Sequence, residues 1–505
     1  MSPIRGSVWV PKQRPAVEPV GAPVEVDVAV VGGGIVGATA ALLLRGHGLN
    51  VALVEARRVG EQVTGGSSAK VTSQHSLLYG HLVRTFGLDL ARRYGEANEW
   101  AIADIEARAR DLGIDCSFER RAAYTYTLDR GRLDEVRDEA ATAAQLGLPA
   151  RFISDVPLPF ATAGAMVFDD QAQFDPYAYV RGVVEAFRRD GGRVLGGVRA
   201  TGLEERDGAQ VLSTTHGEVR ARDVIVATNL PFIDDGQYFA RAVPRAHMVI
   251  AARVPREPVD GMFISIDDPT RSLRSVRRGD HHWLLVVGPS FTPGEEDAAH
   301  EAALIETFAR EHFPVEAIDH AWWNEDYYSV DRLPYVGRLQ AGREHVTLAT
   351  GFSGWGITNG NVAAHILADA VRGVVNPWAS TFDSTRQSDA TDESPLAEIA
   401  RVVTENLATA KNFAAGLLPA RADDPASLER GEGRVMEVDG ERVAVARDDD
   451  GALHLVSALC THLGCELAWN GAMQTWDCGC HGSCFDLDGA VLRGPAVLPL
   501  EPHGR

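Results

Sequence analysis

Cysteine is almost absent from this chain until its C-terminal end. Of the six cysteines in 505 residues, only Cys116 precedes residue 460. A secreted disulfide-stabilised protein would spread its cysteines along the chain, so we expect a metal site in a cytoplasmic protein instead. No apolar run reaches the length of a membrane span. Residues 1–15 also lack the apolar segment of a secretion signal.

Positive charge is scarce as well. The chain has 49 Lys and Arg against 70 Asp and Glu, a formal net charge of −21. This excess of acid argues against nucleic acid or an anionic membrane surface as a partner. Internal repeats are also lacking, while a hydrophobic content of 45% is ordinary for a globular protein. A globular chain of this length is expected to form two or three domains.

Two short loops near the C-terminal end each combine histidine with cysteine. The sequence reads CTHLGC at 460–465 and CGCHGS at 478–483. One cysteine and one histidine from each loop make up the ligand set of a Rieske [2Fe–2S] centre, in which two histidines replace two cysteines on one iron. Neutral imidazoles also raise the potential above that of an all-cysteine ferredoxin. The predicted cluster ligands are Cys460, His462, Cys478 and His481.

A zinc site is the alternative, because Zn²⁺ also accepts two cysteines and two histidines. Zinc fingers group cysteine with cysteine and histidine with histidine, whereas each loop here is mixed. Each loop also holds one further cysteine, Cys465 or Cys480, and a disulfide between these two would pin the loops together. The pattern therefore favours an iron–sulfur cluster. Cys484 fits a small buried hydrophobic residue.

Residues from about 420 to 505 resemble Rieske domains closely. The resemblance implies that Ser483 hydrogen-bonds a bridging sulfide and that GPA at 494–496 is the proline loop that shields the cluster. High-potential members have a tyrosine at the position of Phe485, and its hydroxyl bonds a ligand sulfur. Phenylalanine cannot donate this bond, so we expect a lower potential than in the respiratory proteins.

A dinucleotide-binding pattern lies near the N-terminal end. The glycine-rich turn VVGGGIVG at 30–37 follows a short apolar strand and opens a helix. Gly32 permits the tight turn, Gly34 lets a pyrophosphate approach the backbone, and Gly37 brings helix and strand together. The helix N-terminus attracts the anion. Glu55 closes the next strand 21 residues after Gly34 and would accept ribose hydroxyls.

Residues 26–386 resemble the glycine/D-amino-acid oxidase class of FAD-dependent oxidoreductases, which implies FAD rather than NAD. TGGSSAK at 64–70 matches the loop that crosses the FAD pyrophosphate and reaches the isoalloxazine. GGRVL at 191–195, continuing to Ala200, matches the strand whose backbone meets the adenine. The implied FAD contacts from these stretches are Thr64, Gly66, Ser67, Ser68, Ala69 and Ala200.

Two late stretches match further signatures of this class. They read DRLPYVG at 331–337 and GFSGWGITNG at 351–360. The second implies a helix N-terminus near the flavin N1–C2 carbonyl, where the helix dipole stabilises reduced, anionic flavin. The implied FAD contacts are Asp331, Gly354, Trp355, Gly356, Ile357 and Thr358. The full arrangement is similar to a group of bacterial FAD-dependent oxidoreductases with a C-terminal Rieske module.

The chain departs from sarcosine oxidase, a member of this class, at the substrate site. A lysine that binds the substrate carboxylate falls at Thr358, and a histidine falls at Trp355. The cysteine that tethers the flavin has no counterpart near 268–270, so we expect non-covalent FAD. Arg274 lies roughly where the class presents a base to the flavin, although it also fits a surface arginine in a charged stretch. The candidate catalytic residues are Arg274, Trp355 and Thr358.

Tyrosine and histidine side chains complete the candidates. Tyr124, Tyr126 and Tyr328 are possible pocket walls, although aromatic core residues are commoner. A catalytic role is not favoured for His75 or His247.

The expected fold class is α/β, with a Rossmann-like FAD-binding domain and a β-rich substrate domain, followed by a small all-β Rieske domain. An irregular arm is expected at 1–25, the FAD-dependent oxidoreductase at 26–386, a linker at 387–419 and the Rieske domain at 420–505. The linker is expected to hold an amphipathic helix that starts at Pro395 and docks on the first domain. Helices are expected at 35–45, 88–112, 132–146, 175–190 and 359–371; strands are expected at 26–31, 49–54, 193–195, 223–227 and 346–349, with a β-rich segment at 245–290.

A flavin can accept two electrons together, whereas a Rieske cluster passes one at a time. We therefore expect an enzyme that oxidises an amine or N-methyl amine by hydride transfer to FAD and relays single electrons through the cluster to an external carrier protein or quinone. The alternative is an electron-transfer component in which cluster and FAD connect protein partners without an organic substrate. A third possibility is that the cluster is a redox sensor or a structural staple.

Overall fold

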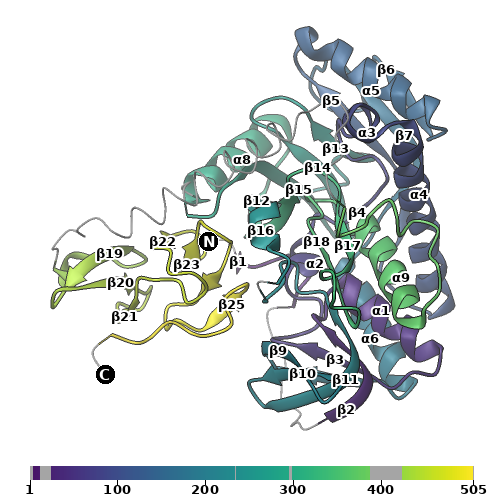
Figure 1. The fold of residues 1–505 in the computed structure, drawn as a ribbon. Helices are drawn as coiled ribbons and strands as arrows, with labels where there is room; N and C mark the ends of the chain where they lie inside the picture. Colours follow the sequence, from purple (N-terminus) through teal and green to yellow (C-terminus); the bar gives the residue numbers. More distant parts are fainter. Residues whose placement is uncertain (1–3, 12–23, 234, 295–297, 387–423, 504–505) are drawn as a thin grey trace.

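The computed structural model describes residues 4–11, 24–233, 235–294, 298–386 and 424–503. It has an α/β part built around two large sheets and a small all-β part at the C-terminal end, drawn in yellow-green to yellow in Figure 1. The helix expected after Pro395 lies outside the described residues. Within the described residues, no helix is long and apolar enough to cross a membrane.

One sheet of the α/β part is mainly parallel. Its central strand β2 pairs in parallel with β3 on one side and β11 on the other. Such strands are buried on both faces, which explains their runs of valine and isoleucine. The order is β17-β18-β11-β2-β3-β8, and β10 pairs with both β9 and β11. The strands are β2 Val24–Val31, β3 Val51–Glu55, β8 Arg193–Gly196, β9 Ala200–Arg206, β10 Ala209–Thr214, β11 Gly217–Val226, β17 Tyr335–Arg338 and β18 Val346–Thr350.

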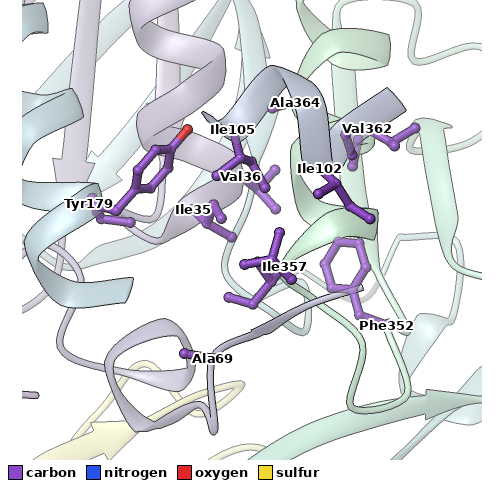
Figure 2. Close-up of a cluster of buried hydrophobic side chains, with 14 of the residues drawn as sticks. Ile35, Val36, Ala69, Ile102, Ile105, Tyr179, Phe352, Ile357, Val362 and Ala364 are labelled. Carbon is purple, nitrogen blue, oxygen red and sulfur yellow. The ribbon is translucent and has the colours of Figure 1, made fainter. Parts of the chain in front are cut away.

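Helices pack together around α1, which follows β2 directly. Figure 2 shows how Ile35 and Val36 of α1, Ile102 and Ile105 of α4 and Val362 of α9 meet in one apolar cluster. Burying such side chains supplies about 25 cal/mol per Å² of apolar surface. The helices of this part of the chain are α1 Ile35–Gly46, α2 Val63–Gly66, α3 Tyr79–Phe86, α4 Leu88–Asp111, α5 Leu133–Gln145, α6 Pro176–Arg189 and α9 Thr358–Arg372, of which α6 and α9 contact α1 directly.

The larger sheet is mainly antiparallel and forms the β-rich half of the α/β part. Its order is β1-β16-β12-β15-β14-β13-β5-β7-β4, with β6 beside β7. Helix α8 (Ala298–His312) packs on β12 and β15. The strands are β1 Ile4–Arg5, β4 Lys70–Val71, β5 Glu119–Thr127, β6 Ala150–Ile153, β7 Gly164–Gln173, β12 Ala242–Val254, β13 Met262–Ser265, β14 Ser272–Arg278, β15 His281–Phe291 and β16 Ala317–Ser329.

Part of the expected irregular arm is ordered against this sheet. Ile4 pairs with His320, which makes β1 a short edge strand beside β16. Val8 and Trp9 are buried. The apolar side chains of the arm thus anchor it, a contact that depends on tertiary packing and carries no local sequence signal.

The C-terminal part contains two small sheets. Strands β19, β20 and β21 form one, and the β19–β20 turn at Asp439 and Gly440 has positive φ at both residues, as the Asp-Gly pair predicts. Figure 1 shows this part beside β16 and β12 of the larger sheet. The strands are β19 Gly433–Val438, β20 Glu441–Arg447, β21 Leu453–Ser457, β22 Leu467–Asn470, β23 Thr475–Cys478, β24 Cys484–Phe485 and β25 Val491–Arg493.

Candidate functional site

The glycine turn between β2 and α1 leaves no room for side chains. A Cβ added at Gly32, whose φ is +108°, would lie 2.3 Å from the Ala227 carbonyl oxygen, and one at Gly37 would lie 1.9 Å from the Gly32 oxygen. Gly32 and Gly34 line a long cavity, whereas Gly37 packs α1 against the turn. An anionic group can therefore approach the N-terminus of α1 closely.

Glu55 lies at one end of this cavity. Its Oε2 accepts a hydrogen bond from the Gly33 N–H at 2.7 Å, and its Oε1 accepts one from the Arg57 N–H at 2.7 Å. Burial raises the pKa of Glu55, while these two bonds and the nearby Arg199 oppose the rise. A carboxylate has about four lone-pair sites, so two remain for hydroxyl donors of a ligand. Ala200 lines the same end.

Two tryptophans hold the loop that begins at α2. The indole N–H of Trp322 donates to the Gly66 carbonyl at 2.8 Å, and that of Trp9 donates to the Ser67 carbonyl at 2.8 Å. A Cβ at Gly66 would lie 2.5 Å from Asn324 Oδ1, so a larger residue there would displace the Asn324 side chain. The hydroxyl of Thr64 accepts from the N–H of Ile35 at 3.2 Å, which ties the loop to the start of α1.

Arg274 supports this loop from behind and does not line the cavity, contrary to the catalytic role expected for it. Its guanidinium donates to the carbonyls of Ser68 at 2.8 Å and Ala69 at 2.7 Å, and its Cζ lies 5.1 Å from the ring centre of Trp9. Ala69 has a φ of +59°, a conformation that costs an alanine energy. Arg274 therefore fixes a strained loop, and its side chain is committed to the backbone.

The loop before α9 closes the other side of the cavity. Asp326 Oδ2 accepts from the Gly354 N–H at 2.7 Å, and burial raises the pKa of Asp326 to about 6. Trp355 stacks on His75 with ring centres 4.7 Å apart. Burial lowers the pKa of His75 to about 3, so this histidine is a neutral support for Trp355.

Two other expected contacts point away from the cavity. Thr358 is buried, and its hydroxyl donates to the Thr72 carbonyl at 3.0 Å, which leaves it no catalytic role at the cavity. Asp331 forms an ion pair with Arg386 at 2.7 Å that holds the turn after β16. The side chains of Thr358 and Asp331 thus stabilise the surrounding structure, through partners that the sequence motifs do not reveal.

The cavity gathers most of the residues expected to bind FAD. Gly37, Ala69, Asp331 and Thr358 are not among the described residues that line it. Those that do are Gly32, Gly34, Glu55, Thr64, Gly66, Ser67, Ser68, Ala200, Gly354, Trp355, Gly356 and Ile357.

The larger sheet covers this cavity with a largely apolar wall. Val249, Ile264 and Val287 line it. His247 Nε2 lies 3.0 Å from the hydroxyl of Tyr328, and burial lowers the pKa of His247, so its imidazole is neutral. Tyr328 thus lines the cavity, which is the less favoured of the two interpretations given for it, whereas Tyr124 and Tyr126 are not among the lining residues.

Lys70 adds a polar corner to this wall and was not singled out from the sequence. Its Nζ donates to the Phe263 carbonyl at 3.0 Å and also bonds the hydroxyl of Ser272. Burial, aided by Arg274, lowers the pKa of Lys70 to about 7. Its position as the last residue of the stretch at 64–70, which matches the flavin loop, is the signal that could have identified it.

The second site lies between the two C-terminal loops. The side chains of Cys460 and Cys478 are buried next to each other, and the neighbouring Cys478 thiol lowers the pKa of Cys460 to about 7. The rings of His462 and His481 lie 4.9 Å apart. Two thiols and two imidazoles are thus brought together from two loops whose ligand residues are 16 or more positions apart, which fits a cluster with one iron on each pair.

A disulfide joins the same two loops. Cys465 and Cys480 are bonded, with their Cα atoms 6.5 Å apart. Their sulfurs lie within 4.8 Å of the Cys478 sulfur, but both are used by the disulfide, so the thiols left for iron are Cys460 and Cys478. The Ala496 N–H donates to Ser483 Oγ at 3.0 Å, which ties the expected proline loop to the second ligand loop.

Strand β16 contributes side chains to both sites. Side chains alternate between the two faces of a strand. Trp322, Asn324, Asp326 and Tyr328 approach the long cavity or its loops. Residue Glu325 instead pairs with Arg493 of the C-terminal part at 3.3 Å, and the hydroxyl of Tyr327 donates to the His481 carbonyl at 2.8 Å.

The C-terminal part also reaches the cavity itself. Residues 492–497, which include the expected proline loop, line it together with Tyr327. Arg199, at the Glu55 end, donates to the Val491 carbonyl at 2.7 Å. Phe239 of the α/β part contacts the rings of both cluster histidines. The centre of its ring lies 6.2 Å from that of His462 and 5.4 Å from that of His481. Sequence motifs do not indicate these contacts, because the contacting residues lie far apart along the chain.

Comparison with known proteins agrees with this geometry. Residues 27–370 match the family described as FAD dependent oxidoreductase, and residues 420–503 match the Rieske [2Fe-2S] domain. The chain is 34% identical over 479 residues to the Bacillus subtilis protein YhfW, described as a Rieske 2Fe-2S iron-sulfur protein, with 94% of this chain and 93% of the relative covered. It is 26% identical over 362 residues to gamma-glutamylputrescine oxidoreductase of Escherichia coli, covering 69% of this chain and 84% of that protein.

Solved structures show the same fold. Glycine oxidase from Geobacillus kaustophilus superposes with a TM-score of 0.61 at 18% identity, over 72% of this chain and all of that chain. The cofactors are thus FAD, for which the glycine turn and long cavity are shaped, and a [2Fe–2S] cluster, for which two thiols and two imidazoles converge.

Proposed function

Because this chain belongs to the FAD dependent oxidoreductase family and ends in a Rieske [2Fe-2S] domain, we propose that it oxidises the C–N bond of an amine or N-methyl amine and passes the electrons singly to its own cluster. Bound FAD supplies an acceptor for hydride, and the cluster supplies a one-electron carrier. An external carrier protein or a quinone then takes the electrons away.

The observation that carries the proposal is the shared strand β16. Tyr327 lines the flavin cavity and bonds the backbone of the cluster ligand His481, while its neighbour Tyr328 lines the cavity beside His247. Tyr327 therefore contacts both the flavin cavity and a ligand loop of the cluster. Such proximity is what a direct electron path inside one chain requires.

The cavity wall suits a small amine. Val249, Ile264 and Val287 exclude water from the reacting carbon, and the hydroxyl oxygen of Tyr328, which bonds the neutral His247, can accept a hydrogen bond from a substrate N–H group. Helix α9 begins just after the Gly354–Ile357 loop, so its positive end lies at the cavity. The relative named gamma-glutamylputrescine oxidoreductase and the structural neighbour named glycine oxidase support this substrate class.

The site residues are proposed in the same way. FAD is held without a covalent bond by the cavity-lining glycines, serines and Glu55, and the cluster by Cys460, His462, Cys478 and His481. Trp355 lines the cavity, and its proposed role is to form one wall of the reaction site. The net charge of −21 argues against a nucleic-acid partner. The gathering of cysteines near the C-terminal end supports a cytoplasmic location.

The test is anaerobic mixing of the purified protein with a panel of amines and N-methylated amino acids. Flavin absorbance and the electron paramagnetic resonance of the reduced cluster are followed together. We expect at least one amine to bleach the flavin first and the cluster to be reduced afterwards. If no amine bleaches the flavin while a reduced carrier protein loads the cluster, the protein is an electron-transfer component without an organic substrate.

A variant with Cys478→Ser separates the two sites. It lacks one cluster ligand, so flavin reduction by the amine should persist while steady-state turnover with a one-electron acceptor is lost. If this variant turns over at the rate of the unaltered protein, the cluster has a structural or sensing role, and the proposed electron transfer through it is contradicted.

A further inference from the structure

Lys70 is one of very few lysines in this chain, in which nearly all basic residues are arginines. Of its 49 basic residues, only Lys12, Lys70 and Lys411 are lysines. An arginine side chain stays charged in a protein, whereas a lysine can lose its proton. The single lysine that lines the flavin cavity, among the described residues, therefore provides a chemistry that the abundant arginines cannot.

The surroundings of Lys70 favour its neutral form. Its Nζ has two acceptors, the Phe263 carbonyl and the Ser272 hydroxyl, and these use both N–H groups of a neutral amine. The remaining lone pair is then free for a ligand in the cavity. In the described part of the chain, Lys70 has no ion pair with an acid, and the positive charge of Arg274 disfavours its protonation.

The other titratable groups near this corner are already committed. Both oxygens of Asp326 accept backbone N–H groups, from Tyr327 and Gly354. His247 bonds the hydroxyl of Tyr328, and burial lowers its pKa. On the far side of Lys70, Arg274 faces Glu119 and Asp175, which act on Arg274 rather than on the amine.

We propose that Lys70 is the base that removes the proton from the substrate ammonium. The inference rests on the proposed amine oxidation. A secondary ammonium gives H⁺ to the lone pair of Lys70 Nζ, which leaves a neutral amine. That amine loses a hydride from the carbon beside nitrogen, and the nitrogen lone pair forms the C=N bond of an iminium product. The two electrons of the C–H bond go to the flavin, the oxidant, and the proton stays on Lys70.

The first test is the pH dependence of flavin reduction by an N-methyl amine in anaerobic single turnover. In the unaltered protein the rate should rise about tenfold per pH unit up to a pKa of about 7, where Lys70 loses its proton. With Lys70→Met the rising limb should move to the pKa of the free amine, about 10, and the rate near pH 8 should fall about 100-fold. Thr270→Val, which changes another polar side chain of the cavity wall, is the control and should keep the limb near 7.

The second test does not depend on turnover. The probe is tert-butylamine, which has no hydrogen on the carbon that carries nitrogen and so cannot be oxidised. At about pH 8.5, between the pKa values of Lys70 and the amine, its binding should release no proton into solution, because Lys70 keeps it. With Lys70→Met, binding should release about one proton per ligand, since only the neutral amine fits the site.

These outcomes separate the possible failures. If Lys70→Met loses FAD, Lys70→Arg replaces it as the test variant, because arginine keeps a long hydrogen-bonding side chain. Arginine cannot accept the proton, so this variant should show the same shift of the rising limb and the same release of a proton. An unchanged pH profile, or equal proton release with and without Lys70, overturns the assignment of Lys70. If no amine reduces the flavin of the unaltered protein, the proposed function fails, and proton release with tert-butylamine still decides whether Lys70 accepts the proton.

Discussion

The hydroxyl of Tyr327 donates a hydrogen bond of 2.8 Å to the carbonyl oxygen of His481. This bond joins β16 of the flavin domain to a ligand loop of the cluster, and Tyr327 lines the flavin cavity as well. A residue of the flavin domain thus contacts the cluster loop directly. It also locates the residues at which the coupling between the sites can be tested.

Replacing Tyr327 by phenylalanine should weaken the coupling without altering the substrate step. Loss of one hydrogen bond costs about 1 kcal/mol, which corresponds to a roughly fivefold change in an equilibrium. We expect cluster reduction after flavin reduction to slow about fivefold, while the amine reduces the flavin at an unchanged rate. Stopped-flow absorbance at flavin and cluster wavelengths measures both. Tyr328→Phe should instead slow flavin reduction by the amine and leave the later reduction of the cluster unchanged. Identical effects of the two variants would contradict the division of β16 into two faces.

Removal of Arg493 should loosen the contact between the domains. Its partner Glu325 has a fully buried side chain, and the guanidinium also lies 4.4 Å from the ring centre of Trp323. Taking away one partner of a buried pair costs about 3–5 kcal/mol, because the other is left buried without compensation. Arg493→Ala should therefore lower the unfolding temperature and expose the C-terminal domain to limited proteolysis. Arg430→Ala changes an exposed arginine of the same domain and should shift stability by less than about 0.5 kcal/mol; equal effects would argue against the buried pair.

The disulfide between Cys465 and Cys480 should stabilise the cluster loops specifically. It closes a loop with a sequence separation of 15. A loop of this length contributes about 3 kcal/mol by restricting the unfolded chain. Replacing both cysteines by serine should accelerate loss of the cluster on mild heating, measured by its visible absorbance, and leave the FAD content unchanged. Cys116→Ser, a buried thiol outside these loops, is the control. Retention of the cluster at the original rate would mean that the disulfide is dispensable.

Phe485 offers a way to shift the potential of the cluster alone. Its side chain is fully buried next to Trp476, its partner across β23 and β24. Phe485→Tyr adds a hydroxyl that can donate to a ligand sulfur and stabilise the reduced, more negative cluster. A bond worth about 1 kcal/mol raises a one-electron potential by about 40 mV. Protein-film voltammetry should show this rise with an unchanged flavin potential. A lower cluster potential would show that the hydroxyl does not reach a ligand.

Local spacing predicted much of the flavin domain. Helix α1 begins at Ile35 as expected, because the glycines that precede it and the apolar residues that follow specify turn and helix together. Glu55 likewise ends β3, and the two cluster loops meet as their paired cysteines and histidines suggested. The Asp-Gly turn at Asp439 has the backbone that this dipeptide favours. Each of these features depends on residues close together in the sequence.

The features that the sequence did not reveal depend on distant partners. Arg274 looked like a pocket cation, but the carbonyls it binds belong to Ser68, Ala69 and Phe174, which only the folded sheet brings to it. Thr358 turns toward Thr72 for the same reason. The alternation in β16 is visible in the sequence, yet nothing local indicates that its second face meets another domain. The domain limits and the individual ligand assignments stay predictions.

The central claim is electron transfer between the two sites inside one chain. The most direct measurement is anaerobic laser-flash reduction of the flavin, with cluster absorbance recorded over a hundredfold range of protein concentration. We predict that the cluster is reduced in a first-order process whose rate constant does not change with concentration. A rate constant that rises in proportion to protein concentration, or a cluster that stays oxidised beside a reduced flavin of lower potential, would contradict the account.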